Sequence, residues 1–576
     1  MDKEFLKDCF KGYTWDQDKT VGPEITVARV REKMTAAGID LLHRTERIDN
    51  GRLDIPVFVS VCGRDALEVM PTRKQMGKGA TPAQAEASAV MEMVERYSFY
   101  HFIGRRPWFE AEYDQVKDRA MPFEHLAASV HHDPRDLDRA RLALGGLKLA
   151  WTTGYNLTRK QECLVPFNWF YEINQFNGSS AGNTLEEAVS QGLFEVVERH
   201  VSALVSRGRL ATPSIDPESL QNPVSRELRD NFRRAGVQVF LKDFSLGQGI
   251  PTVAALAYDP ATFPGSSEIV FTAGTASDPE KALIRALTEV AQLGGDFNTK
   301  SNFLASGLPK FTDPDQADYI IGPAPLAAMD SLPNLASDNI KTEIERAAAA
   351  LAGQGLEVYV VDVTHPDLGI PAVYVIIPGA HFRERAVGAS VPFFAAKLLA
   401  AGDDAEAFFG LSRLLEIYPE GYYLHFHQGQ ALLEQGLAGE AAEALTLALE
   451  MDPPGEDLAG ILTYLGLARK ELEDYHGAIS ALEKSIAADP ERQDAYNLLG
   501  VCLFKTKQHE RAIDAFRHVL KIDPGSGIDY ANIAVNYREL GRKDDAIENF
   551  RVALELDPSL DWAWQALARL ENSGAE

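Results

Sequence analysis

Met91-Glu92-Met93-Val94-Glu95-Arg96 recurs in near-identical form 103 residues further along the chain, as Phe194-Glu195-Val196-Val197-Glu198-Arg199. Each copy carries two glutamates three residues apart. Residues i and i+3 share one face of a helix, so each copy can direct two carboxylates at one point. Paired carboxylates are ligands that a hard divalent cation prefers. The repeated motif therefore indicates two helices with metal-binding faces.

The likeness between the two segments extends back to the start of each helix. Thr81 and Thr184 each stand eleven residues before the first glutamate, and threonine is a favourable N-cap residue. A third segment keeps this spacing, with Asp278 as the cap and Pro279 at the first helical position. Positions seven, eleven and fourteen after each cap share one helix face and form three polar stripes: Ser88, Glu92 and Glu95; Gln191, Glu195 and Glu198; Arg285, Glu289 and Gln292. We expect three related helices, packed on a sheet, whose polar stripes converge on a charged ligand.

A structural explanation of the motif is the main alternative to a ligand site. A Glu-x-x-Glu-Arg stretch on one surface helix is usually a solvated, self-paired face. A duplicated structural unit could also repeat the capping pattern alone. It would not need to gather Glu, Gln and Arg on helices that are otherwise rich in apolar residues. Three matched copies therefore favour the ligand site.

These segments resemble the three signatures of the YcaO family, at residues 77–96, 180–199 and 285–292. The resemblance covers roughly residues 15–395 in order, and three ordered motifs are more specific than one. It implies an ATP-dependent enzyme that activates a peptide backbone amide. In the family, the amide oxygen attacks ATP and becomes a phosphorylated hemiorthoamide, whose breakdown leaves an azoline, a thioamide or an amidine.

The resemblance also implies a set of ligands for magnesium and ATP. Glu92, Glu95, Glu195 and Glu198 would hold magnesium between the phosphates. The expected nucleotide contacts are Lys19, Thr26, Ser88, Asn183, Gln191, Arg199 and Arg285. Magnesium prefers carboxylate and phosphate oxygens, and arginine neutralises charge on a transferring phosphoryl group, so the residue types suit these roles. No residue is assigned a further catalytic role.

Two common catalytic motifs are missing from the sequence. Gly77-Lys78-Gly79 is not a P-loop, because glycine follows the lysine where a P-loop has serine or threonine. Lys78 could therefore serve the turn before the helix as well as the nucleotide. The thirteen histidines give no recognisable catalytic triad either, which disfavours a nucleophilic hydrolase.

Five β-branched or aromatic runs bounded by turns predict strands in the first two thirds of the chain, at residues 55–61, 237–241, 252–257, 356–363 and 372–377. Strands mixed with long helices indicate an α/β catalytic region. Residues 204–235 and 322–355 are expected to be connecting, partly helical segments.

The last third of the chain has a different organisation. Prolines recur at spacings of 34, 37, 34 and 34 residues: Pro419, Pro453, Pro490, Pro524 and Pro558. This period is the signature of tetratricopeptide repeats, which stack helical hairpins into a superhelix. We expect Gly500, Phe516 and Phe550 to pack within the hairpins, and the groove candidates are Asn497, Asn532 and Asn536. The predicted fold is thus an α/β YcaO-like catalytic domain at residues 1–398 followed by an all-α tetratricopeptide-repeat superhelix at 399–576.

Composition limits the class of protein. A chain of 576 residues with 45% hydrophobic residues can form more than two compact units. The net charge of −27 disfavours an exposed nucleic-acid surface, so no nucleic-acid partner is expected. The four cysteines are scattered and lack zinc-ligand spacing, which favours free thiols in a reducing compartment. No signal peptide or long apolar run is found, and we predict a cytoplasmic protein without a membrane partner.

The end of the sequence bears on the expected product. Azoline-forming members of the family commonly end in a proline-rich tail, whereas this sequence ends Glu571-Asn572-Ser573-Gly574-Ala575-Glu576. The difference disfavours azoline synthesis. It favours support of ribosomal-protein methylthiolation, or thioamide formation with a separate sulfur-delivery partner.

The function expected from the sequence is ATP- and magnesium-dependent activation of a backbone amide in a peptide or protein substrate. The repeats would bind a protein partner, and the family resemblance makes a homodimer the default. Two alternatives stay open. One is a non-catalytic nucleotide-binding adaptor that acts through its repeats, and the other is an ATP-dependent ligase or phosphotransferase for small molecules.

Overall fold

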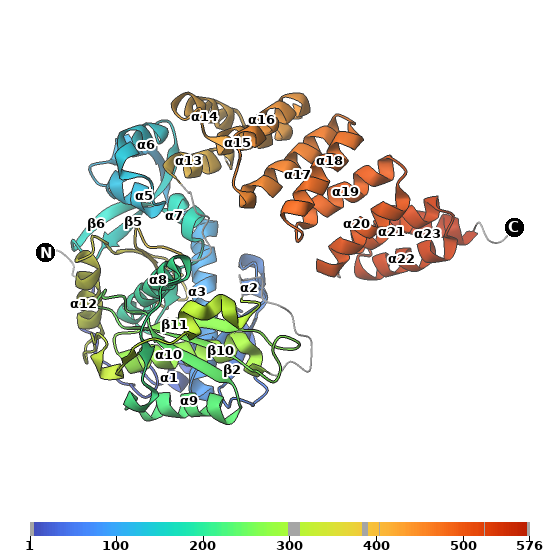
Figure 1. Cartoon of the computed structure of the whole chain (residues 1–576). Coiled ribbons are helices and arrows are strands. Elements are labelled where there is room, and N and C mark those ends of the chain that lie inside the picture. The colour runs from blue at the N-terminus through green and yellow to red at the C-terminus, as the bar shows by residue number, and fades with distance from the viewer. Residues whose placement is uncertain (1–4, 298–310, 383–389, 402–403, 523–524, 573–576) are drawn as a thin grey trace. The chain divides into compact units, whose positions relative to one another are not determined.

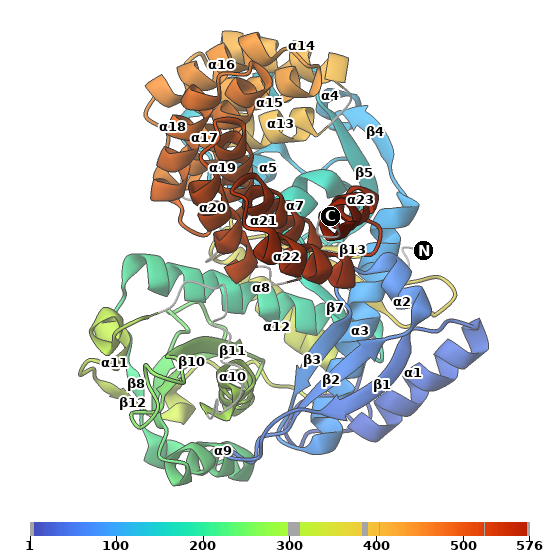
Figure 2. The same cartoon turned by 90° about the vertical axis from the view of Figure 1, so that its right-hand side faces the viewer.

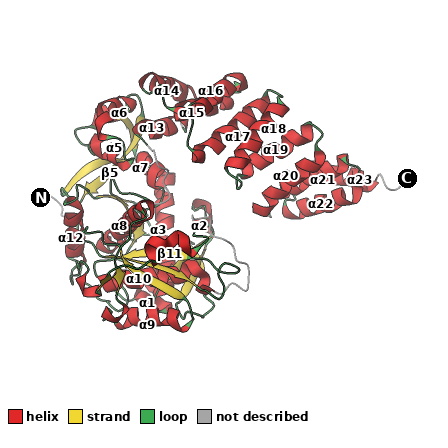
Figure 3. Ribbon diagram, viewed as in Figure 1, coloured by secondary structure: helices red, strands yellow, loops and turns green. Residues whose placement is uncertain are grey.

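The computed structural model describes residues 5–297, 311–382, 390–401, 404–522 and 525–572. The chain forms two compact units, one of residues 1–134 and 148–387 and the other of residues 135–147 and 388–576. The first unit mixes strands and helices, and the second is helical (Figure 3). The α/β region followed by helical repeats confirms the predicted fold class. Within the described residues, no helix is long and apolar enough to cross a membrane.

Three sheets form the first unit among the described residues. One is antiparallel and contains β1 (Leu42–Arg47), β2 (Val57–Cys62) and β3 (Lys74–Lys78). A second has the order β11-β10-β9-β8-β12, with the strands β8 (Ser214–Ile215), β9 (Gln238–Asp243), β10 (Thr252–Tyr258), β11 (Val270–Thr275) and β12 (Leu326–Ala327). The five predicted strands are confirmed as β2, β9, β10, β13 and β14.

The third sheet has the order β4-β5-β13-β14-β7, and β6 pairs with the other edge of β5. Its strands are β4 (Phe109–Glu112), β5 (Lys148–Asn156), β6 (Gln161–Pro166), β7 (Ser179–Ala181), β13 (Tyr359–Asp362) and β14 (Ala372–Ile376). Its strands pair antiparallel. One core of the unit lies between β13, β14 and the helices α8 and α12, where the apolar side chains are fully buried.

The three motif helices are α3 (Pro82–Arg105), α8 (Leu185–Gly208) and α10 (Pro279–Gly294). They follow β3, β7 and β11, and each packs back on the strand before it (Figures 1 and 2). The predicted caps are confirmed. Thr81 accepts the N–H of Gln84 at 3.2 Å, Thr184 accepts that of Glu187 at 3.2 Å, and Asp278 accepts those of Glu280 and Lys281.

Glycines permit the close approach of two of these helices to the turns before them. A Cβ on Gly79 would lie 2.7 Å from the backbone nitrogen of Ala85, and a Cβ on Gly182 would lie 2.5 Å from that of Ala188. Both glycines stand two residues before their capping threonine. The matched positions show that the two segments share one strand-turn-helix geometry.

The remaining helices of the first unit connect these sheets. They are α1 (Pro23–Ala37), α2 (Arg64–Val69), α4 (Tyr113–Val116), α5 (Phe123–Ser129), α7 (Phe167–Asn174), α9 (Pro223–Arg234), α11 (Asp318–Ile321) and α12 (Ile340–Ala352). The segments expected to be partly helical, 204–235 and 322–355, contain α9 and α12. This confirms their assignment.

The second unit is a series of helical hairpins. Its repeat segment begins with α13 (Val391–Ala400) and α14 (Asp404–Ile417) and ends with α23 (Asp561–Asn572). The hairpins between them are α15 (Tyr422–Glu434) with α16 (Ala438–Glu450), α17 (Gly455–Glu471) with α18 (Tyr475–Ala488), α19 (Gln493–Lys505) with α20 (His509–Ile522), and α21 (Gly527–Glu539) with α22 (Lys543–Leu556). Four of the recurring prolines fall in the turns between hairpins, and Pro524 lies outside the described residues. The repeat period therefore marks the hairpin boundaries.

Packing inside the hairpins follows the expected pattern. A Cβ on Gly500 would lie 2.6 Å from the ring of Phe516, so glycine lets α19 and α20 approach closely. Phe516 and Phe550 are buried. Asn536, a groove candidate, is also buried, and its side chain donates to the carbonyl of Asn532 at 2.9 Å. Asn536 therefore supports the repeat itself.

A short helix from the middle of the catalytic sequence belongs to the repeat unit. The helix α6 (Leu137–Ala143) packs against α13 and α14. Arg139 donates to the carbonyl of Ile417 at 2.6 Å, pairs with Glu420 at 2.7 Å and lies 3.8 Å over the ring of Tyr418. The chain thus passes between the two units three times. The sequence-based boundary after residue 398 stays a prediction about which part can fold alone.

Candidate active site

The three polar stripes line one cavity of about 270 Å³ in the first unit. All nine stripe residues take part, as do Lys19, Thr26, Asn183 and Arg199. Each side chain expected to contact metal or nucleotide therefore stands at the wall of the same cavity. The sheet-packed helices supply most of them, because the stripe of each helix is the face turned away from its apolar strand contacts.

Arg285 connects the second and third helices. Its Nη1 donates to Oε1 of Gln191 at 2.8 Å, and its guanidinium lies 3.7 Å from the carboxylate of Glu198. Glu198 also accepts the backbone N–H of Thr275 at 3.1 Å. Within the second helix, Arg199 pairs with Glu195 at 3.0 Å. These contacts hold two carboxylates of α8 at the cavity, each beside one arginine.

Ser179 connects the first helix to the end of β7. Its hydroxyl donates to Glu95 at 2.8 Å and accepts from Arg96 at 3.2 Å. Arg96 lies 3.3 Å from Glu95 and stacks 4.0 Å over the ring of Phe176. The guanidinium is thereby fixed beside Glu95, whose carboxylate has one neutral donor and one cation as partners.

Burial and like charges raise the pKa values of three cavity carboxyl groups. Burial, with Glu195 and Glu92 nearby, raises the pKa of Glu95 to about 8 although Arg96 opposes the shift. Burial and the charge of Glu289 raise the pKa of Glu198 to about 7 against the effect of Arg285. The pKa of Glu92 is also raised, mainly by burial. The charged forms of these carboxyl groups are therefore disfavoured at this wall, and a bound cation would stabilise them.

Two further ionic groups of the cavity were not assigned site roles from the sequence. Lys78 on β3 forms an ion pair with Glu289 on α10. Burial acts to raise the pKa of Glu289, but Lys78 outweighs it and holds the pKa below its usual value. The sequence pattern does single out Glu289, because it stands eleven residues after its helix cap, as Glu92 and Glu195 do. Its pairing with Lys78 joins segments more than two hundred residues apart, which no local pattern reveals.

The cavity is closed on one side by the N-terminal segment. Asn183 donates to the hydroxyl of Thr26 at 3.0 Å and to Glu187 at 2.9 Å. Burial acts to raise the pKa of Glu187, but Lys19 and hydrogen bonds from Thr20 outweigh it and hold the pKa below its usual value. Lys19, Thr26 and Asn183 are thus brought together around Glu187, a residue without an assigned role in the sequence analysis.

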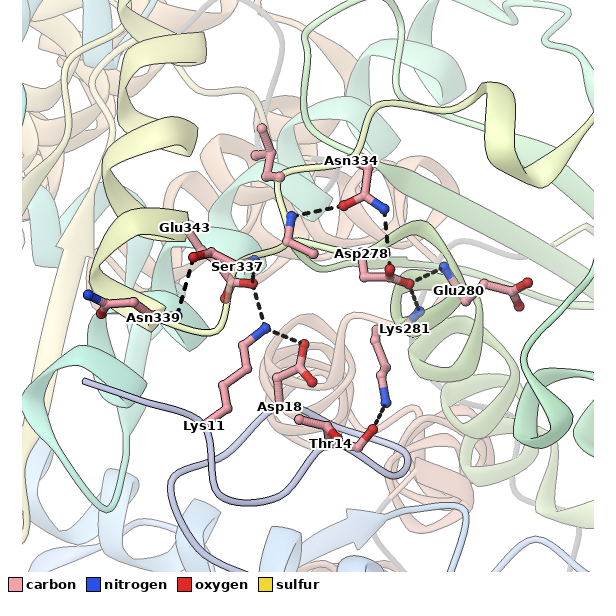
Figure 4. A network of polar contacts seen from close by, with 12 residues as sticks. Lys11, Thr14, Asp18, Asp278, Glu280, Lys281, Asn334, Ser337, Asn339 and Glu343 are labelled. Carbon is pink, nitrogen blue, oxygen red and sulfur yellow. Dashed lines mark hydrogen bonds and ion pairs between the residues drawn. The ribbon is translucent and has the colours of Figure 1, made fainter. Parts of the chain in front are cut away.

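A polar network holds this N-terminal segment in place (Figure 4). Lys11 pairs with Asp18 at 2.9 Å and with Glu343 at 2.6 Å. Lys281 donates to the carbonyl oxygens of Thr14 and Trp15. The segment is therefore attached to both α12 and the start of α10, and Lys19 is positioned at the cavity by contacts outside it.

Comparison with known proteins places this architecture in a family. Residues 76–381, more than half of the chain, match the model described as YcaO cyclodehydratase, ATP- and Mg²⁺-binding. The chain belongs to the YcaO family. Tetratricopeptide-repeat models match residues 395–456, 465–527 and 530–560 beyond the YcaO domain.

Individual relatives cover the YcaO domain to different extents. An uncharacterized protein of Methanothermobacter thermautotrophicus is 30% identical over 387 residues, which are 63% of this chain and 94% of that protein. The ribosomal protein S12 methylthiotransferase accessory factor YcaO of Escherichia coli is 28% identical over 343 residues, 53% of this chain and 56% of the relative. A solved heterocyclase in complex with substrate and cofactor aligns with a TM-score of 0.52 and 25% identity, covering 66% of this chain and 54% of that one.

The cavity of the YcaO domain fits ATP and Mg²⁺. Arg285 Nε and Gln292 Oε1 are buried at its wall without a hydrogen-bond partner among the described residues. Buried polar atoms of this kind need a partner, and a nucleotide with its phosphates offers both acceptors and donors. Among the same described residues, no ready-made cluster of His, Cys, Asp and Glu forms a metal cage. This arrangement suits Mg²⁺, which commonly uses a few carboxylates together with phosphate oxygens and water.

Proposed function

We propose that this protein uses ATP to phosphorylate a backbone amide oxygen of a peptide or protein substrate. The phosphorylation prepares the amide for replacement of its oxygen by sulfur. The observation that carries the proposal is the convergence of three matched helices on one cavity. Their stripes supply clustered carboxylates, an arginine and amides, which is the combination that phosphoryl transfer requires. The terminal phosphoryl group of ATP would move to the amide oxygen, and ADP would leave.

The four glutamates of α3 and α8 are the proposed magnesium ligands, namely Glu92, Glu95, Glu195 and Glu198. Their mutual crowding supports this role, because burial of like charges is costly unless a cation neutralises them. Bound Mg²⁺ supplies charge neutralisation of the phosphates and orients them. Arg96 and Arg199 hold the glutamates beside them in place through short ion pairs.

The nucleotide contacts are proposed to come from three directions. Lys19, Thr26 and Asn183 form the N-terminal side, Ser88 and Gln191 lie on the helix stripes, and Arg199 and Arg285 provide the cations. Arg285 is the strongest candidate for charge neutralisation during transfer, since its Nε has no hydrogen-bond partner in the part of the chain that the structure describes. Its link to Gln191 fixes the guanidinium plane before substrate arrives.

The repeats and the relatives support a partner for the sulfur step. The Escherichia coli relative is named as an accessory factor of a methylthiotransferase. By analogy, a protein bound through the repeats would deliver sulfur or complete the modification. A sulfide-level sulfur would add to the activated amide carbon, inorganic phosphate would leave with the former amide oxygen, and the amide would become a thioamide. A small-molecule ligase is less well supported, because such an enzyme has no evident use for a repeat array.

Comparative mass spectrometry tests the proposal. Proteins from cells that produce the native protein are compared with those from cells that produce Glu195→Gln. The proposal expects at least one backbone position with the mass change of oxygen-to-sulfur exchange, lost in the variant. Native protein that turns over ATP without altering any protein's mass, while it joins a small carboxylate to an amine, would replace the proposal with the ligase alternative.

A further inference from the structure

Lys78 occupies a position that all three strand-turn-helix segments share. It is the last residue of β3 and stands three positions before the helix cap. The last residues of β7 and β11, each three positions before its own cap, are Ala181 and Thr275. A short side chain thus fills the same position in two of the three segments. The turn itself therefore does not require a lysine.

Close packing of strand on helix fixes the direction of the Lys78 side chain. A Cβ on Gly77 would collide with the backbone nitrogen of Ala89 in α3, and a Cβ on Gly274 would lie 2.6 Å from that of Ala286 in α10. The two glycines stand four residues before their caps, and the two alanines eight residues after them. Gly77 therefore faces α3. Successive side chains of a strand point to opposite sides, so Lys78 points away from that helix face.

The Lys78 side chain reaches the third motif helix at the wall of the cavity. Its ammonium group pairs with Glu289, its one ionic partner within the described residues. The two side chains are 29% and 25% exposed, so the pair borders the cavity and does not fill a core. Burial acts to lower the pKa of Lys78, but the charges of Glu289 and Glu92 outweigh it and raise the pKa above its usual value. Lys78 is therefore charged at neutral pH.

Lys78 is held less firmly than two other cations of this cavity. Arg96 has a carboxylate, a hydroxyl group and an aromatic ring as partners. Arg285 donates to Gln191 and lies beside Glu198. Lys78 has a single ion pair, and its ammonium group ends a flexible four-carbon chain. It can therefore move to another anion at the cost of one ion pair.

The side of the cavity that Lys78 faces differs in charge from the other two. The stripes of α3 and α8 each carry two glutamates, at offsets eleven and fourteen from the cap. The stripe of α10 keeps Glu289 at offset eleven, but it carries Arg285 at offset seven and Gln292 at offset fourteen. With Lys78, this side has two cations and one carboxylate. Cations placed in this way suit the oxygens of a transferring phosphoryl group.

We propose that Lys78 is a catalytic residue for phosphoryl transfer, whose ammonium group leaves Glu289 and contacts the non-bridging oxygens of the transferring group. This inference rests on the proposed function, because it assigns a residue to that transfer. The bond from the γ-phosphorus to the ADP oxygen breaks as the bond to the amide oxygen forms, and ADP takes the electron pair. Lys78 keeps its proton and neutralises charge on the phosphoryl oxygens. Exchange of one anion for another changes ground-state binding little, so the main effect is on the transition state.

Affinity labelling tests whether Lys78 reaches the terminal phosphate. The probe is an ATP analogue with a pyridoxal aldehyde attached to its terminal phosphate, used at mildly alkaline pH. The aldehyde forms an imine with a nearby amine, borohydride reduces the imine, and mass spectrometry of peptides locates it. Lys78 should be labelled, and excess Mg²⁺ with ATP should prevent the labelling. Exposed Lys74 of the same strand is the control and should show no ATP-protected label. Absence of an ATP-protected label on Lys78 would overturn the proposal.

Substitution of Lys78 supplies the kinetic arm, at a temperature at which circular dichroism shows each variant folded. Lys78→Met should lower the kcat of ATP turnover at least about a hundredfold. Its Kd for a non-hydrolysable ATP analogue with Mg²⁺ should stay within about fivefold of the native value. Lys78→Arg keeps the charge and should regain at least about tenfold in kcat over Lys78→Met. Lys74→Met should keep full turnover.

Three kinetic results would contradict a catalytic role of Lys78. They are native kcat in Lys78→Met, no gain in kcat from arginine, and a Kd that rises as much as kcat falls. Failure of the proposed function has a different signature. A native protein whose Lys78 takes an ATP-protected label, but which alters no peptide amide, would contradict the proposed function. A native protein that modifies a peptide amide, while Lys78 is neither labelled nor needed, would contradict this inference alone.

Discussion

Arg285 on the third motif helix donates a 2.8 Å hydrogen bond to Gln191 on the second. The two residues occupy the same offset from their helix caps, seven positions after Asp278 and Thr184. Equivalent positions of two similar strand-turn-helix segments thus meet at one cavity. The third equivalent, Ser88 on α3, lines the same cavity. The site is built by repetition of one local geometry around a common point.

The magnesium ligands give the first prediction. Glu92→Gln and Glu195→Gln each remove a charged ligand with little change in volume, so Mg²⁺-dependent ATP turnover should fall by about a hundredfold or more. Circular dichroism should show an unchanged fold. Glu68→Gln, an exposed glutamate of α2, serves as the matched control and should keep full turnover. Turnover at the native rate in either cavity variant would remove the glutamates from the metal site.

The Lys78–Glu289 ion pair gives the second prediction. Replacing Lys78 with methionine removes the ion-pair partner of the partly buried Glu289 carboxylate, which should destabilise the protein by about 1–3 kcal/mol. The double variant Lys78→Met, Glu289→Gln should recover most of that loss in a denaturant titration. A double variant no more stable than Lys78→Met alone would show that the pair does not act as a unit.

The same pair predicts a pH dependence of stability. The pKa of Glu289 is lower in the folded protein than its usual value, so its contribution is complete above the unfolded pKa of about 4.3. It is lost as the pH falls through the lower, folded pKa. The stability difference between native protein and Lys78→Met should therefore be large at pH 7 and shrink below about pH 4. A difference that grows in acid would contradict this assignment.

Hairpin packing in the repeats gives the third prediction. Gly500→Ala would place a methyl group 2.6 Å from the Phe516 ring, and the overpacking should cost about 1–3 kcal/mol in chemical denaturation. Gly439→Ala in α16 is the matched control, because a Cβ there meets no atom within 4 Å. That change should be neutral or slightly stabilising. Equal effects of the two substitutions would mean that helix propensity, not packing, decides both.

The contacts of the helix α6 lead to a more specific prediction about the domain boundary. A shortened protein that ends after residue 420 retains Ile417, Tyr418 and Glu420, the partners of Arg139. We expect it to stay soluble and to bind ATP within about threefold of the full chain in calorimetry, because every cavity residue precedes residue 293. A protein that ends after residue 400 leaves α6 without these partners and should unfold at a lower temperature. Loss of ATP binding in a soluble 1–420 protein would show that the repeats contribute to the active site.

Helical periodicity explains why much of the site could be predicted from the sequence. Once Thr81, Thr184 and Asp278 are recognised as caps, the 3.6-residue period places the stripe residues on one face of each helix. Seven of the eleven predicted metal and nucleotide residues line the cavity for that reason, and Lys19, Thr26, Asn183 and Arg199, which the family resemblance implied and which lie off the stripes, line it as well. Their individual roles stay predictions. The repeat period located the hairpins in the same way, because one residue type at a fixed spacing marks each turn.

Long-range pairing explains what the sequence could not supply. The strand β5 lacks a regular alternation of apolar and polar residues, because it is buried along most of its length. It was not predicted. The attachment of α6 to the repeats depends on the contact of Arg139 with Ile417, 278 residues further along the chain. Lys78 and Glu289 are likewise more than two hundred residues apart in the sequence. Contacts of this kind follow from the folded topology, and a single sequence carries no local pattern for them.

Calorimetric titration of ATP into the full-length protein tests the central claim most directly, namely that three matched helices form a magnesium-dependent nucleotide site. In the presence of Mg²⁺, ATP should bind with a stoichiometry of one per chain. Excess EDTA should abolish this binding, and Glu198→Gln should weaken it at least about tenfold. Equal ATP affinity with Mg²⁺ and with EDTA, or no binding to the native protein, would contradict the account.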